Sequence, residues 1–133
     1  MTFIRLIGLA SSLVLLLTFA ARADDQYQLK TTDVPIPDGP NGAWVSSTIA
    51  ISGAPSGAVV TRIDVYFKCI HTYSGDLIVD LNADAQGALG NRNLWNREGG
   101  AADNPTRTVN GVTTFNGLSV NRTWYLYSRD MAA

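Results

Sequence analysis

A stretch of alternating side chains, residues 59–70, limits most strongly the folds that this chain can adopt. The apolar residues Ile63, Val65 and Phe67 alternate with polar or amphipathic ones over this stretch. Successive side chains of a β-strand point to opposite faces, so the alternation predicts a strand with one buried side. Cys69 continues the apolar series and is the sole cysteine of the sequence. We therefore expect a buried, inert thiol and no internal disulfide.

Other parts of the chain also have strand composition, and turn residues separate them. β-branched and aromatic side chains are frequent in residues 43–52, 77–81, 94–95, 112–115 and 123–127. Residues 96–110 are polar and rich in Gly, Asn and Asp, so we expect mainly loop there. After residue 23, apolar residues do not recur at the spacing of an amphipathic helix. Short strands between turns predict an all-β fold and favour an antiparallel β-sandwich.

The first residues, 1–23, have the pattern of a secretory signal peptide. Arg5 supplies a positive charge, an apolar segment follows it, and Ala21-Arg22-Ala23 fits the small-x-small cleavage rule. We expect cleavage after Ala23, because the apolar segment is too short and wrongly flanked for a stable membrane anchor. This predicts a secreted or periplasmic protein with no membrane segment after cleavage.

Two regions are expected after the signal peptide. Residues 24–42 are rich in proline and glycine and predict an extended N-terminal segment, and residues 43–133 predict one β-sandwich domain. Removing Arg5 and Arg22 from the ten basic residues leaves eight against eleven acidic ones, a net charge near −3. No basic cluster is present, so nucleic acid is not expected as a partner.

The single histidine lies in the run His71-Thr72-Tyr73-Ser74-Gly75-Asp76-Leu77, between two predicted strands. A Ser-His-Asp catalytic site needs side chains that converge from separate elements, whereas these three lie in one short run. A Gly-x-Ser-x-Gly elbow is also missing. We therefore expect no catalytic site. His71 is interpreted as a structural residue bonded to the following turn, and Asp76 as an acceptor of local amides.

Asp76, Asp80 and Asp84 follow one another at intervals that suggest a calcium hypothesis. An EF-hand beginning at Asp80 is rejected, because Ala85 occupies the position of the required glycine and Asn91 that of the bidentate glutamate. A looser calcium site, formed by the three carboxylates with loop carbonyls, stays open as a hypothesis. No other cofactor is expected.

The large aromatic residues are expected mainly to fill the core or to form cross-strand pairs. Trp124 in particular fits a core position. Tyr125 and Tyr127 alternate with it in the predicted last strand, so they should share the opposite face of that strand. This pair is a candidate exposed patch for a partner.

Several motifs resemble one protein family. They are Ile36-Pro37-Asp38, the stretch Val45 to Ile49, the His71 to Leu77 run, and Phe115-Asn116-Gly117 leading to Thr123-Trp124. In this order they resemble the P domain (P/Homo B domain) that follows the catalytic domain in kexin- and furin-like subtilisin proteases, the proprotein convertases. The resemblance implies a jelly-roll-type, galactose-binding-domain-like β-sandwich. The residues that carry the motif are His71, Thr72, Tyr73, Gly75, Asp76, Leu77, Asn116, Gly117 and Trp124.

The sequence departs from the family pattern in two places. Residues 82–87 stand where the family has a Ser-Pro-x-Gly-Thr turn. The closing Gly-Asp-x-Gly turn and the last Trp-x-Leu strand have no counterpart up to Ala133. We therefore expect a stand-alone, C-terminally truncated domain that lacks its last strand and has a free edge.

The resemblance implies a non-catalytic accessory domain that stabilises and regulates a serine endopeptidase, and thus an association with proteolysis. The expected partner is a subtilisin-like or other secreted protease. Two alternatives stay open. One is a secreted interaction or adhesion module that binds protein or glycan through the exposed edge and the aromatic patch. The other is a remnant of a longer secreted protease.

Overall fold

The computed structural model describes residues 28–32, 34–38 and 42–132. The predicted signal peptide lies outside the described residues, as does part of the expected extended segment, 24–42. The described residues of that segment belong to no helix or strand, as expected. Among the described residues, no helix is long and apolar enough to cross a membrane.

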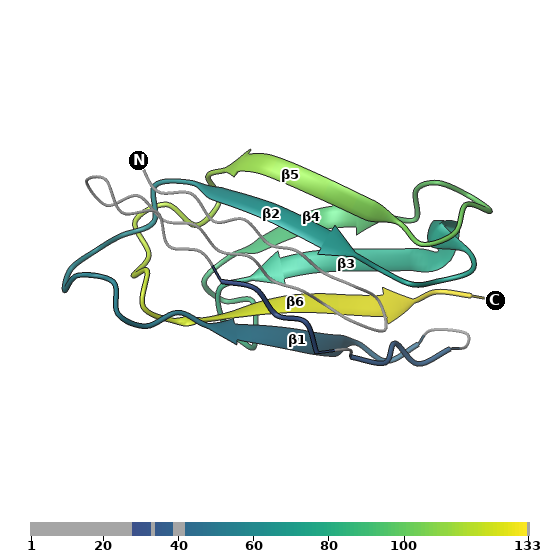
Figure 1. Ribbon diagram of the computed structural model, residues 1–133, viewed down its shortest axis with the longest axis horizontal. Coiled ribbons are helices and arrows are strands. Elements are labelled where there is room, and N and C mark those ends of the chain that lie inside the picture. Colours follow the sequence, from purple (N-terminus) through teal and green to yellow (C-terminus); the bar gives the residue numbers. More distant parts are fainter. Residues whose placement is uncertain (1–27, 33, 39–41, 133) are drawn as a thin grey trace.

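The described residues form two antiparallel sheets. The four-stranded sheet has the order β1-β6-β3-β4, and the two-stranded sheet pairs β2 with β5. The strands are β1 (Val45–Ala50), β2 (Ile63–Lys68), β3 (Leu77–Asn82), β4 (Asn91–Asn96), β5 (Thr106–Val112) and β6 (Thr123–Asp130). A 3-10 turn, η1 (Ser74–Asp76), precedes β3. Figure 1 shows the strands running close to the long axis of the molecule, with β2 and β5 side by side. The predicted all-β, antiparallel class is confirmed, and the two sheets are compatible with a β-sandwich.

The core lies between the two sheets because alternation gives each inner strand one apolar face. In β2 the side chains of Ile63, Val65 and Phe67 have no exposed surface. They belong to the same buried cluster as the inward residues of β3 and β6, which are Leu77, Val79, Leu81, Trp124 and Leu126. The ring of Phe67 meets Trp95 of β4 edge-on, with 6.2 Å between their centroids. This contact joins the two sheets directly.

Cys69 continues the buried face of β2, as the alternation predicted. Its side chain is 1% exposed, and burial raises the pKa of the thiol to about 12. A thiol with this pKa stays protonated near neutral pH and is a poor nucleophile. The prediction of a buried thiol is therefore confirmed.

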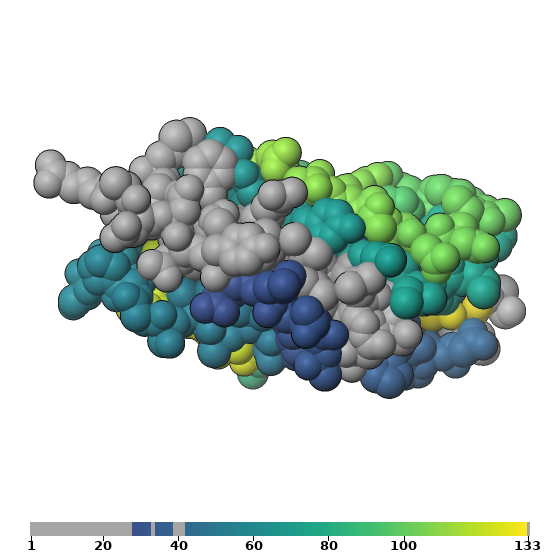
Figure 2. All heavy atoms as spheres, viewed as in Figure 1, coloured from purple at the N-terminus to yellow at the C-terminus, as the bar shows by residue number. Residues whose placement is uncertain are grey.

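Strand β5 corrects the prediction for residues 96–115. The strand occupies Thr106–Val112, most of which was expected to be loop, and it ends where a weak strand was expected to begin. Most of its side chains are exposed, and the light green atoms of this part of the chain lie along the upper right of the molecule in Figure 2. The polar composition concealed a strand that forms by backbone pairing with β2.

A bulge in β5 explains why the pattern was hard to read. Ile63 pairs with Val112 and Val65 with Val109, so β5 uses one residue more than β2 between the two pairs. Gly111 has a φ of 71° within this bulge, and its N–H donates to Asp64 Oδ1 at 2.6 Å. Asp64 is consequently buried, although the alternation placed it on the outer face.

Strand β6 is longer than the sequence predicted and reaches Asp130. It pairs with β1 on one side and with β3 on the other, so it has no free edge. Within the part of the chain that the structure describes, β1 and β4 form the edges of this sheet. The free edge expected from a missing last strand therefore does not fall on β6.

Candidate functional site

Hydrogen bonds hold the corner formed by residues 71–77 against the loop that precedes β5. Ser74 N donates to Ala102 O at 2.8 Å, and Gly75 N donates to Gly100 O at 2.9 Å. His71 N donates to Asn104 Oδ1 at 3.1 Å, and its carbonyl accepts from Asn104 N at 2.8 Å. These bonds fix the corner at its start, through the backbone of His71, and at its centre, through the backbone of Ser74 and Gly75.

Both ring nitrogens of His71 have partners. Nε2 lies 3.2 Å from Asp130 Oδ2, and Nδ1 lies 3.0 Å from Tyr73 O and 3.2 Å from Tyr73 N. An ionised carboxylate only accepts hydrogen bonds, so Nε2 is the donor. Nδ1 then accepts from Tyr73 N in the neutral ring, or donates to Tyr73 O in the charged ring. The predicted bond between His71 and the following turn is present.

Asp130 ties this corner to the end of β6. Its side chain is 1% exposed, and its Oδ1 accepts from Ala132 N at 2.8 Å. Its backbone carbonyl accepts from Gly42 N at 3.0 Å. A buried carboxylate needs such partners, because leaving it unpaired costs several kilocalories per mole. His71 therefore has a clear structural role.

Ser74, His71 and Asp76 do not form a catalytic triad in this structure. Ser74 Oγ is buried and has no hydrogen-bond partner among the described residues. The carboxylate of Asp76 faces Arg97, 3.8 Å away, and not His71. Arg97 is the side-chain partner that the described residues give the Asp76 carboxylate, so the interpretation of Asp76 as an acceptor of local amides gains no support and stays a prediction.

The other residues of the motif occupy turns and core positions. A side chain at Gly75 would come within 2.8 Å of the Tyr73 ring and 3.1 Å of Gly100, so the corner requires glycine there. Gly117 has a φ of 84° in the turn after Asn116. The remaining motif residues are Leu77 and Trp124, which are fully buried, and Thr72 and Tyr73, which are exposed.

Asp76, Asp80 and Asp84, the residues of the calcium hypothesis, have separate partners. Asp80 Oδ1 accepts from Asn93 Nδ2 at 2.6 Å. Asp84 accepts from the backbone of Leu89, Gln86 and Ala88 at 2.5, 2.8 and 3.1 Å. These hydrogen bonds, that of Leu89 above all, hold the pKa of the Asp84 carboxyl below its ordinary value.

In the part of the chain described, no three His, Cys, Asp or Glu side chains form a group that could hold a metal ion. The geometry therefore adds no support to the calcium hypothesis. It stays a hypothesis, and it predicts a higher melting temperature in excess calcium than in chelator.

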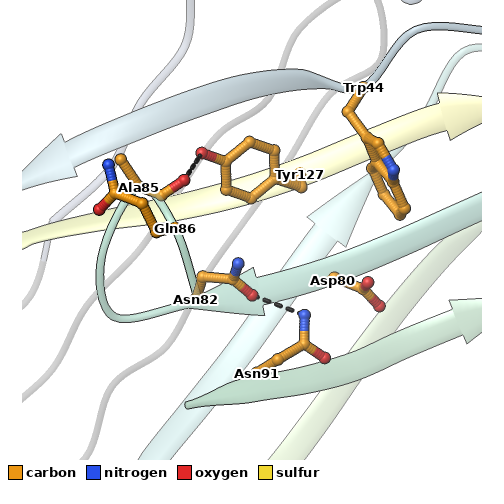
Figure 3. A pocket seen from close by; sticks show the side chains of 7 residues that line it. All are labelled: Trp44, Asp80, Asn82, Ala85, Gln86, Asn91 and Tyr127. Carbon is orange, nitrogen blue, oxygen red and sulfur yellow. Dashed lines mark hydrogen bonds between the residues drawn. The ribbon is translucent and has the colours of Figure 1, made fainter. Parts of the chain in front are cut away.

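A groove on the outer face of the four-stranded sheet is the second candidate site. Strand register places Tyr127 between Ser46 and Asp80, and Asp80 opposite Asn93. The next row places Asn82 between Tyr125 and Asn91. The groove has a volume of about 230 Å³, and Figure 3 shows the residues that line it: Trp44, Asp80, Asn82, Ala85, Gln86, Asn91 and Tyr127.

Aromatic contacts and hydrogen bonds fix the walls of this groove. The rings of Trp44 and Tyr127 meet edge-on at 6.4 Å, and Tyr127 stacks on Tyr125 at 6.0 Å. Tyr127 OH donates to Ala85 O at 2.8 Å, and Asn91 Nδ2 donates to Asn82 Oδ1 at 2.7 Å (Figure 3).

The sequence predicted only one part of this groove. It placed Tyr125 and Tyr127 opposite Trp124, and the structure confirms this, since Trp124 is fully buried. It expected the tryptophans mainly in the core, but Trp44 is 42% exposed. The sequence signal for the rest of the groove is a side-chain amide at an outward-facing strand position, as at Asn82 and Asn91.

The chain is similar to two protease-related Streptomyces proteins. It is 44% identical over 106 residues to leupeptin-inactivating enzyme 1 of Streptomyces exfoliatus, a match covering 77% of this chain and 22% of that protein. It is 36% identical over 104 residues to the transglutaminase-activating metalloprotease of Streptomyces mobaraensis, covering 76% of this chain and 12% of that protein. The match thus spans less than a quarter of either protease-related relative. No protein-family model and no solved structure matches the chain.

Proposed function

We propose that this chain is a secreted, non-catalytic accessory domain that works with a protease. The observation that carries the proposal is the similarity over 106 residues, which covers most of this chain but only 22% of leupeptin-inactivating enzyme 1. A match of this extent is typical of a domain that recurs as one part of larger proteins. The association with proteolysis follows from both relatives.

The geometry of the corner supports a non-catalytic role. A serine nucleophile needs a hydrogen-bonded base, and Ser74 has none among the described residues. The ring of His71 is already engaged by Asp130 and Tyr73. In this proposal the run from His71 to Leu77 therefore has a structural role, and the catalytic groups belong to the partner protease.

The finer proposal is that the chain acts as a P domain does, by stabilising and regulating a catalytic domain. The motif residues from His71 to Leu77 support it, because they hold a corner between strands of the core. A subtilisin-like partner is the version that the motif resemblance suggests. One relative is named as a metalloprotease, so we propose that the stabilising role does not depend on the catalytic mechanism of the partner.

A domain replacement in leupeptin-inactivating enzyme 1 tests this function. Three forms are produced: the intact enzyme, a form without the matched segment, and a form in which residues 24–133 of this chain replace that segment. We expect deletion to lower the yield of secreted active enzyme and replacement to restore it. Purified chain alone should leave leupeptin intact. Inactivation of leupeptin by the chain alone, or no effect of deletion, would contradict the proposal.

A further inference from the structure

We propose that the groove on the outer face of the four-stranded sheet binds one ring of a neutral saccharide. This inference goes beyond the accessory role and does not rest on it. The groove combines an exposed aromatic wall with a rim of amide and carboxylate groups (Figure 3). A sugar ring has the matching chemistry, since its C–H face is apolar and its edge carries hydroxyl groups.

The aromatic wall keeps exposed surface, although the guanidinium of Arg129 lies over one face of the Trp44 ring. Trp44 is 42% exposed, whereas Trp95 and Trp124 are 8% and 0% exposed. Tyr127 fixes the position of Trp44 by an edge-on contact, and Tyr127 is itself held by its bond to Ala85. Exposed and positioned aromatic side chains are typical of ligand sites, because they offer apolar area with little loss of conformational entropy.

The polar rim has unused hydrogen-bonding capacity after its internal bonds are made. The Asn91–Asn82 bond uses one donor and one acceptor, and Asp80 Oδ1 is taken by Asn93. The side-chain carbonyl of Asn91, the second carboxylate oxygen of Asp80 and the side-chain amide of Gln86 make no hydrogen bond to another described residue. Hydroxyl groups both donate and accept, so this mixture of free acceptors and donors suits a sugar edge.

The charges around the groove favour a neutral ligand over a charged one. The guanidinium of Arg129 already lies 4.6 Å from the centroid of the Trp44 ring, where a cationic ligand would otherwise gain most. No Lys or Arg is among the residues that line the groove, and Asp80 would repel an anion. A neutral ligand neither competes with the guanidinium of Arg129 nor is repelled by the carboxylate of Asp80.

The volume of the groove indicates the size of its ligand, and the way the groove is built indicates the affinity. A volume of about 230 Å³ lies below the roughly 300 Å³ at which pockets for drug-sized ligands begin, so the groove suits a single ring. Most of its side chains stand on β3, β4 and β6, which keeps them positioned before binding. A shallow site of this kind should bind with a Kd of the order of 1 mM.

Titration of the purified chain, followed by ¹⁵N NMR, tests the proposal. The probes are glucose, galactose, mannose and N-acetylglucosamine, with tetramethylammonium and glucuronate as charged comparators. We expect saturable shifts of the Trp44 indole and of the Asn82 and Asn91 amides with at least one neutral sugar. Trp44→Ala and Gln86→Ala should each weaken binding by about 10-fold.

Gln86→Ala keeps the test decisive if Trp44→Ala fails to fold, because the Gln86 side chain is exposed and makes no bond to another described residue. Tyr73→Ala is the matched control, since this exposed aromatic residue lies outside the groove and its replacement should leave affinity unchanged. Three results would overturn the proposal: no saturable shift with any sugar up to roughly 100 mM, sugar affinity unchanged in Gln86→Ala, or tighter binding of a charged comparator. The domain replacement described above has an independent readout, so either idea can fail alone.

Discussion

Replacing His71 by alanine removes the donor that Asp130 faces in the interior. Asp130 is 1% exposed at its side chain and His71 is 18% exposed, so solvent screens this pair only weakly. A hydrogen bond to a charged group contributes roughly 1.5–3 kcal/mol. Asp130 keeps the bond from Ala132 N, which limits the loss. We expect His71→Ala to lower the free energy of unfolding by about 2 kcal/mol.

The assay is urea unfolding of the purified chain, followed by tryptophan fluorescence, with the melting temperature as a second readout. A loss of about 2 kcal/mol should lower the melting temperature by roughly 8–16 °C in a domain of this size. A double-mutant cycle with Asp130→Ala should give a coupling of about 1–2 kcal/mol between the two residues.

Thr72→Ala is the matched control, because Thr72 lies in the same run, is exposed and makes no side-chain bond to another described residue. Its effect should stay within about 0.5 kcal/mol. A His71→Ala variant that behaves like this control, with no coupling in the cycle, would contradict the expected loss. His71 would then contribute nothing to the corner, and a different role would have to be sought for it.

Three further predictions concern the core, the β3–β4 turn and the thiol. Phe115→Ala should cost about 3–5 kcal/mol in urea unfolding, because the ring is fully buried and packs edge-on against Trp124; a loss below about 1 kcal/mol would contradict this. Asp84 has a folded-state pKa below its ordinary value of 3.8, so its stabilising contribution is present above that value and disappears as pH falls through the folded pKa. Asp84→Asn should therefore flatten the acid limb of the stability curve, and an unchanged limb would oppose this. Cys69 should react with Ellman's reagent only after unfolding, and rapid reaction in native buffer would refute its burial.

The parts of the fold with strong alternation were predictable from the sequence. Strand β6 buries every second side chain, and β2 follows the same alternation except at Asp64, which is also buried; hydrophobic burial determines which face points inward. Strand β5 was not predictable in this way, because it exposes most of its side chains and is held by pairing with β2. A local pattern carries little information about a strand that buries so little.

The candidate sites were predictable only where their residues are close in sequence. The corner was identified from one run, but its partner Asp130 lies 59 residues from His71. The groove depends on the register that places Tyr127 beside Asp80 and Asn82 opposite Asn91. Register is a property of the assembled sheet, so no single stretch of sequence could reveal the groove.

The thermal inactivation of leupeptin-inactivating enzyme 1 tests the central claim most directly. The half-life of its activity is compared at one temperature for the intact enzyme, the form without the matched segment, and the form that carries this chain instead. If the chain is a stabilising accessory domain, the replaced form should outlast the deleted form and approach the intact enzyme, with its activity per folded molecule unchanged. Equal half-lives for the replaced and deleted forms would contradict the claim.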